Sequence, residues 1–239
     1  MTIMTRTPLD ARTGTDLPPA ARLAMAASAV LAPALVILGL LWHRELASAD
    51  DRATVTAIAA DVDAFTLDAW MAPVATLVWI PAILAVARVA RAGARGLGLA
   101  GLLLGFLVAV PLVADPGQLA YVAVSSGLDV DATLRLLETA ASGPSAVFGW
   151  AFVAGLLGLV LLGAAILRGR SAPRWAGVAL VAGPVAVVPS WASGSLAATV
   201  VTWGIVLIGF AGCAWALVTG GAESGAPAAA RAAAPSQAL

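Results

Sequence analysis

The chain has 239 residues, of which 61% are hydrophobic and only 11% are charged, and its formal net charge is zero. A soluble domain carries about 25% charged residues, so a chain with a mean hydropathy of +0.97 has too little polar surface to cover a water-facing fold. The composition excludes an ordinary soluble domain and predicts an all-α, polytopic integral membrane protein.

Six apolar runs are near the length of about 20 residues that a helix needs to cross a bilayer. They cover residues 21–42, 69–87, 97–114, 146–167, 175–192 and 196–218. The fifth run contains Pro184 and Pro189 and is followed by Ser193-Gly194-Ser195, so it is either a full crossing or a kinked, re-entrant segment. We predict a helical membrane bundle of six spans over 19–219, flanked by disordered tails at 1–18 and 220–239.

Arginine is distributed unevenly between the two sides that six spans define. The side of the two termini holds Arg6, Arg12, Arg22, Arg88, Arg91, Arg95, Arg168, Arg170, Arg174 and Arg231. The other side holds only Arg44, Arg52 and Arg135. The positive-inside rule then predicts a multi-pass protein of the cell membrane with both termini in the cytoplasm. Most acidic residues lie on the opposite side, so we expect an acidic outer surface.

The first long outer loop, 43–68, contains a helical pattern. Its apolar residues recur at helical spacing from Val55 to Phe65, which predicts a short amphipathic helix. Ser48 with Asp51 three residues later resembles a capping box for that helix.

The second long outer loop, 115–145, contains a similar pattern. Asp129 or Asp131 can cap a helix that runs to about Ala141. We expect both short helices to lie on the membrane interface or to plug the mouth of the bundle. The first four spans then form two similar hairpins, each closed outside by a short helix, which suggests an internal duplication of layout.

The predicted spans contain essentially no ionisable residue, although such residues usually mark function inside a bilayer. The sequence also lacks an HExxH, a Walker or a GxSxG motif. These absences argue against a proton-coupled pump, a voltage sensor and an intramembrane metalloprotease. We expect no metal, no cofactor and no nucleic acid, with membrane lipids, an apolar small molecule or another membrane protein as partners.

Polar side chains gather at the predicted outer ends of the spans. His43, Asp68 and Asp115 are the candidate catalytic residues, because a histidine beside carboxylates can act as a general acid or base. The candidate substrate-binding residues are Glu45, Trp70, Gln118, Tyr121, Ser190 and Trp191. The alternative is structural: polar residues belong at helix ends, and Trp and Tyr form interface belts in any membrane protein.

Gly101 and Gly105, with Gly98 before them, form a small-xxx-small face. Such a face permits close helix packing. We favour packing within the chain over a dimer interface.

Several segments resemble actinobacterial six-span membrane proteins that have not been characterised. They are Gly39-Leu-Leu-Trp-His43, Pro81 followed by an arginine-rich turn, and Leu167-Arg-Gly-Arg-Ser-Ala-Pro-Arg-Trp175. Such proteins often have proline after the histidine, where this chain has Arg44. The resemblance covers most of 21–218 and implies a fold rather than an activity.

Three functional hypotheses remain open at this point. We favour a binding or accessory component of the cytoplasmic membrane without catalysis of its own. The alternative is a small membrane enzyme, such as a cyclase or transferase, that acts on a lipid or prenyl substrate with outer-face acids. A weaker alternative is a small-molecule facilitator. They are distinguished by whether the polar span ends converge on an enclosed cavity.

Overall fold

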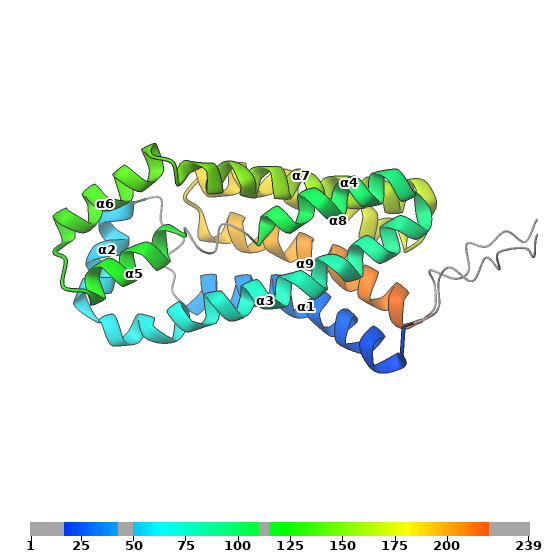
Figure 1. Cartoon of the computed structure of the whole chain (residues 1–239), viewed down its shortest axis with the longest axis horizontal. Helices are drawn as coiled ribbons and strands as arrows, with labels where there is room; N and C mark the ends of the chain where they lie inside the picture. Colours follow the sequence, from blue (N-terminus) through cyan, green and yellow to red (C-terminus); the bar gives the residue numbers. More distant parts are fainter. Residues whose placement is uncertain (1–16, 43–49, 110–114, 220–239) are drawn as a thin grey trace, which may run out of the picture.

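The structure, a computed structural model, describes residues 17–42, 50–109 and 115–219, and these ranges contain helices and no strand. The elements are α1 (Pro19–Trp42), α2 (Asp51–Ala60), α3 (Val62–Gly93), α4 (Arg95–Gly105), the 3₁₀ turn η2 (Phe106–Val108), α5 (Pro116–Ser125), α6 (Val130–Ser142), α7 (Ala146–Gly169), α8 (Arg174–Ala192) and α9 (Leu196–Val218). Figure 1 shows α1, α3, α4, α7, α8 and α9 along the long axis, with α2, α5 and α6 gathered at one end. The predicted all-α helical bundle is confirmed.

Five helices, α1, α3, α7, α8 and α9, are long and apolar enough to cross a membrane. Their outward faces carry large exposed apolar side chains, such as Leu77 (67% exposed) and Val201 (63%). Apolar surface over a whole bundle is unfavourable in water and is stable in contact with lipid. The predicted span 196–218 coincides with α9.

The predicted span 97–114 gives a shorter helix. Eleven residues in α4 and three in η2 rise roughly 22 Å, which is less than the hydrocarbon thickness of about 30 Å. Residues 110–114 lie outside the described residues, so the sixth span stays a prediction.

The fifth predicted span is one continuous helix. Helix α8 holds both Pro184 and Pro189 within its 19 residues, and it is long enough to cross a membrane. Its neighbours α7 and α9 pack along it, which is the setting in which membrane helices tolerate proline. The predicted break becomes the turn into α9, where Gly194 takes a positive φ of 61°.

Glycine allows α4 and α7 to touch through their backbones. A Cβ on Gly158 would overlap the backbone of Gly105, and one on Gly155 would overlap that of Val108. A Cβ on Gly101 would meet Leu162 at 2.8 Å. The small-xxx-small face is therefore used inside the chain, as predicted.

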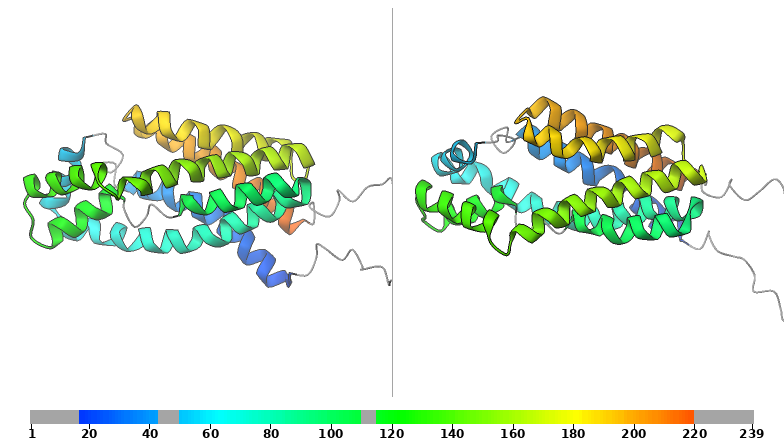
Figure 2. Two further views of the ribbon diagram at one scale, coloured as in Figure 1. Left: turned by 45° about the horizontal axis from the view of Figure 1, so that its top comes forward. Right: turned by 90° about the horizontal axis from the view of Figure 1, so that it is seen from above.

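Helix α3 is longer than the predicted span 69–87. Its 32 residues rise about 48 Å, so roughly a third of it extends beyond a bilayer. Helices α2 and α5 pack on this protruding part and α6 packs on α2 and α5, so that all three lie at this end of the bundle (Figure 2). A separate apolar cluster of Val55, Ile58, Phe65, Ala120 and Leu137 joins them. We call α2, α5, α6 and residues 62–68 of α3 the cap.

The cap differs from the predicted outer helices in two ways. Asp61 ends α2 and caps α3 by accepting a hydrogen bond from the Ala64 N–H at 3.1 Å, so the pattern from Val55 to Phe65 belongs to two helices. The second loop holds two helices, α5 and α6, rather than one. The two predicted hairpins therefore differ in layout.

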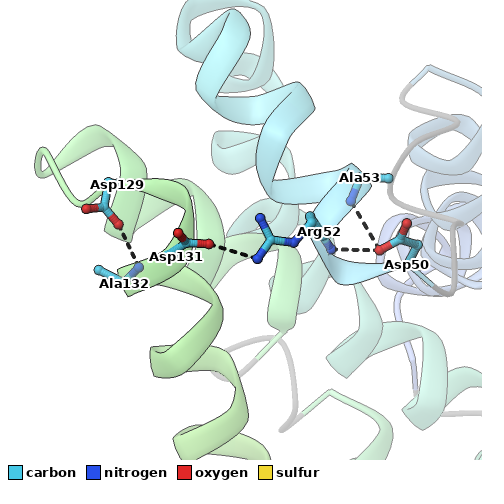
Figure 3. A network of polar contacts seen from close by, with 6 residues as sticks. All are labelled: Asp50, Arg52, Ala53, Asp129, Asp131 and Ala132. Carbon is cyan, nitrogen blue, oxygen red and sulfur yellow. Dashed lines mark hydrogen bonds and ion pairs between the residues drawn. The ribbon is translucent and has the colours of Figure 1, made fainter.

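Aspartates cap the helices of this region, as Figure 3 shows in part. Asp50, and not the predicted Ser48–Asp51 pair, is the N-cap of α2: its carboxylate accepts from the Arg52 N–H at 3.0 Å. Ser48 lies outside the described residues. Asp129 caps α6 through the Ala132 N–H at 2.7 Å, as predicted, and α6 ends one residue beyond the predicted Ala141.

The two ends of the bundle carry opposite charge. Every acidic residue that the structure describes lies on the cap or on the segments beside it. At the opposite end, which we call the arginine end, lie Arg22, Arg88, Arg91, Arg95, Arg168, Arg170 and Arg174.

Candidate functional site: a cavity between the bundle and the cap

A cavity of about 440 Å³ lies where the cap meets the bundle. Its described lining comes from α1, α2, α3, α5, α6, α8 and α9. Polar groups in this lining are Asp51, Thr54, Asp68, Asp115, Gln118 and Thr199. Apolar and aromatic groups are Leu35, Val36, Leu40, Met71, Ala72, Ala75, Leu137, Trp191 and Trp203. The volume falls within the range of about 300–1,000 Å³ that is typical of small-molecule sites.

Asp68 lies in the second turn of α3 and is half-buried. A Cβ built on Gly39 of α1 would lie 3.5 Å from its Oδ1 atom, so the carboxylate lies against α1. Gly39 leaves room for it there. Asp68 is thus an acid at the level where α3 enters the bundle.

Asp115 caps α5 and also lines the cavity. Its carboxylate accepts a hydrogen bond from the Gly117 N–H at 2.7 Å. Partial removal from bulk water raises the pKa of Asp115, and the backbone hydrogen bonds from Gly117 and Gln118 oppose this rise. Asp115 also keeps accessible surface, so its desolvation is incomplete.

Gln118 and Trp191 complete the predicted residues that line the cavity. The Gln118 Nε2 donates to the Ala69 carbonyl at 3.3 Å, which ties α5 to α3. Trp191 stacks on Phe152, with ring centroids 5.1 Å apart and planes 23° apart. Four of the predicted residues therefore lie on one cavity although they come from three separate helices.

The other predicted residues are placed elsewhere. Trp70 is 72% exposed and does not line the cavity. Tyr121 shares a 3.0 Å hydrogen bond with Thr66 on the neighbouring α3, and the buried Ser190 donates to its own helix at Val187. These hydrogen bonds give Tyr121 and Ser190 structural roles. His43 and Glu45 lie outside the described residues, so the histidine hypothesis stays a prediction.

Sequence reasoning missed several residues of the lining, among them Asp51, Thr199 and Trp203. Thr199 and Trp203 stand four residues apart on α9, a spacing that places them on one helix face. The sequence shows this spacing, but it does not indicate which other helices that face of α9 packs against.

Trp203 is only 2% exposed, and its Nε1 is buried without a hydrogen-bond partner. Its ring packs edge-on against Trp79 at 6.1 Å, so the indole is held in place. Buried donors are nearly always paired. Within the described chain, Trp203 alone combines an unpaired buried donor with a place in the cavity lining.

The described lining offers carboxylate and amide acceptors beside aromatic and aliphatic surface. Among the residues that the structure describes, His, Cys, Asp and Glu form no group of three able to hold a metal ion. The Thr54 and Thr199 hydroxyls donate hydrogen bonds to the backbone carbonyls of Asp50 and Ser195. This chemistry suits recognition of an amphipathic molecule.

The fold and site define a helical membrane bundle whose cavity is covered by a small cap. A scan against family models found no match, and searches of curated proteins and of solved structures found no similar chain. The resemblance to actinobacterial six-span proteins therefore stays a prediction.

Proposed function

We propose that the protein is a membrane-embedded binding protein that holds an amphipathic small molecule in the cavity between bundle and cap. The cavity is the observation that carries this proposal. Its volume of about 440 Å³ suits a ligand of ordinary metabolite or short lipid size.

The ligand's chemistry follows from the two kinds of wall. Leu35, Val36 and Ala75 provide an apolar side from α1 and α3. Asp51 and Asp115 provide acceptors on the cap side. An amphipathic ligand with a hydrogen-bond-donating or positively charged polar end and an apolar body fits both walls.

Binding is favoured over catalysis because three of the described polar groups in the lining make structural hydrogen bonds. Asp115 caps a helix, and the lining threonines bond to backbone carbonyls. These bonds stabilise helices and do not join a nucleophile to a base, as covalent catalysis requires. An accessory role in the membrane, delivering or sensing the ligand, agrees with this arrangement.

Filling the cavity tests the proposal. Ala72→Phe adds a ring to a half-buried lining position, whereas Val74→Phe adds bulk on a side that is already 54% exposed. We expect mass spectrometry of extracts from purified protein to find an amphipathic species with wild type and Val74→Phe, and to lose it with Ala72→Phe. Equal extracts from all three folded proteins would contradict the proposal.

A second candidate function is catalysis on a lipid or prenyl substrate. The raised pKa of Asp115 inside the cavity favours it, since a carboxylic acid that keeps its proton to higher pH can act as a general acid. Asp115→Asn keeps the helix cap and removes that proton. If the protein is an enzyme, cells carrying this variant accumulate substrate in place of product; identical extracts from variant and wild type exclude this role for Asp115.

The proposed orientation places the cap outside the cell and the arginine end in the cytoplasm. Alkaline phosphatase is active only outside the cytoplasm. Fused after Ala59, in the cap, it should be active; fused after Gly93, at the arginine end, it should be inactive. The opposite pattern would contradict the orientation.

A further inference from the structure

Two turns meet at the arginine end through their glycines. One joins α3 to α4 at Gly93–Arg95, and the other joins α7 to α8 at Gly169–Arg174. A Cβ on Gly169 would overlap the backbone of Gly93. We call these two turns together the arginine junction, which lies at the end of the bundle opposite the cap (Figures 1 and 2).

The arginine junction gathers positive charge where a helix does not favour it. Arg95 is the first residue of α4 and Arg174 the first residue of α8. A helix N-terminus carries a partial positive charge and is stabilised by acids, not by cations. Neither helix has an acid in its first turn or a side-chain cap, whereas α2, α5 and α6 all begin with a capping aspartate.

Arg170, in the turn between α7 and α8, has an unusual backbone conformation. It ends α7 with φ 54° and ψ 33°, a left-handed conformation that glycine adopts at least cost. Among the described residues, Arg95, Arg170 and Arg174 form no ion pair, and the Arg52–Asp131 salt bridge lies at the cap. All three arginines are exposed.

A buried hydroxyl points into the same place. Ser171 is 6% exposed, and its Oγ has no hydrogen-bond partner in the described chain. The Oγ lies 3.1 Å from the position that a Cβ on Gly93 would occupy, so it is directed at the opposing turn. The Ser171 hydroxyl, the uncapped N–H groups at two helix starts and the three guanidinium groups are donors of the kind that bind phosphate oxygens.

We infer that the arginine junction binds the phosphate headgroup of an anionic phospholipid. A lipid is favoured over a free anion because the junction stands at the end of apolar helices, where headgroups lie. Trp175, next to Arg174, is 52% exposed, as is typical of tryptophan at a membrane interface. This site is separate from the cavity, and the inference does not depend on the proposed function.

Lipid titration of the full chain in detergent tests this inference. Bound phosphatidylglycerol and phosphatidylcholine are counted by native mass spectrometry. We expect one tight site for phosphatidylglycerol, which Arg95→Gln with Arg174→Gln weakens roughly tenfold to hundredfold. Arg170→Gly also weakens it although glycine suits that backbone, and Ser171→Ala weakens it by roughly threefold to tenfold. Arg135→Gln on the cap leaves it unchanged.

Thermal stability distinguishes a specific lipid site at the arginine junction from nonspecific attraction of anionic lipid to positive charge. Without lipid, Arg95→Gln with Arg174→Gln should melt above wild type, because two cations leave helix N-termini; with phosphatidylglycerol, wild type should gain stability and the variant should not. Equal binding of both lipids, equal loss in Arg135→Gln, or no effect of Ser171→Ala would overturn the inference. Competition by inorganic phosphate as strong as that by the lipid would replace the lipid with a soluble anion, and would also overturn it.

Discussion

The bundle and the cap are held together by different kinds of contact. In the bundle, α4 and α7 approach until glycine backbones touch, at Gly105 with Gly158. In the cap, aspartates close the helix starts and a small apolar cluster around Ile58 and Leu137 joins the helices. Lipid provides no hydrophobic drive between helices, so the bundle uses close packing; water provides that drive, so the cap uses a core and capped helix ends.

The cavity lies where the bundle meets the cap, and each of them provides one wall. Asp115 shows the overlap: it caps α5 for the cap's stability and also faces the cavity. Four predictions test the comparison, from the largest expected effect to the smallest.

The largest effect is expected for Gly158→Ala in α7. Its Cβ would overlap the Gly105 backbone, which cannot move aside as a side chain can, so we expect a loss of about 3 kcal/mol or complete failure to fold. Gly204→Ala in α9, where a Cβ meets nothing within 4 Å, should be neutral or gain about 0.5–1 kcal/mol. Unfolding in detergent measures both, and equal effects would refute backbone packing at Gly158.

Ile58→Ala in the cap should destabilise one region alone. Ile58 is fully buried in the cap's cluster, and its truncation should remove about 2–5 kcal/mol. Hydrogen exchange should then rise in α2, α5 and α6 and stay unchanged in α7 and α9. Thr56→Ala, exposed on the same helix, is the control. Equal loss of protection across the bundle would show that the two regions fold as one.

The folding stability of the protein should depend on pH through Asp115. Its folded pKa is raised above the ordinary value of 3.8, so the folded state binds more protons than the unfolded state between the two pKa values, and stability falls as the pH rises through this window. Asp115→Asn keeps the cap and should remove that fall, whereas Asp115→Ala should lose about 1 kcal/mol of capping at all pH values. Melting temperatures measured from pH 4 to 8 test this, and a parallel pH dependence in Asp115→Asn would contradict it.

The smallest effect is expected for the Arg52–Asp131 ion pair, which joins α2 to α6 at 2.8 Å (Figure 3). The side chains are 63% and 67% exposed, so water screens the pair and we expect a coupling of about 0–1 kcal/mol. A double-mutant cycle with Arg52→Gln and Asp131→Asn measures it. A coupling above 2 kcal/mol would mean that the cap depends on charge rather than on its apolar cluster.

Most of the bundle could be predicted from the sequence, because each long helix corresponds to a long apolar run. The apolar runs that predict α7 and α9 begin at the same residues as those helices, because a polar turn precedes each run. The sequence did not predict α5, although Asp115 followed by Pro116 is a helix-start signal. The break at Asp61 was also missed, because apolar spacing continues across it and only the aspartate cap marks the boundary.

The candidate site was predictable in part. Asp68, Asp115, Gln118 and Trp191 stand at helix ends on one side of the predicted membrane, so their convergence follows from topology. Trp203 was out of reach of this reasoning, because its place in the lining depends on how deep α9 sits beside α3, and that depth is set by long-range packing.

One measurement tests the central claim, a ligand cavity between bundle and cap, most directly. A photoreactive benzoylphenylalanine is placed at Met71, which lines the cavity, or at Leu77, which is 67% exposed on the same helix. After irradiation in cells, mass spectrometry of the purified protein should find one discrete, enriched adduct at position 71 and a mixture matching the bulk phospholipids at position 77. The same bulk mixture at both positions would contradict the account.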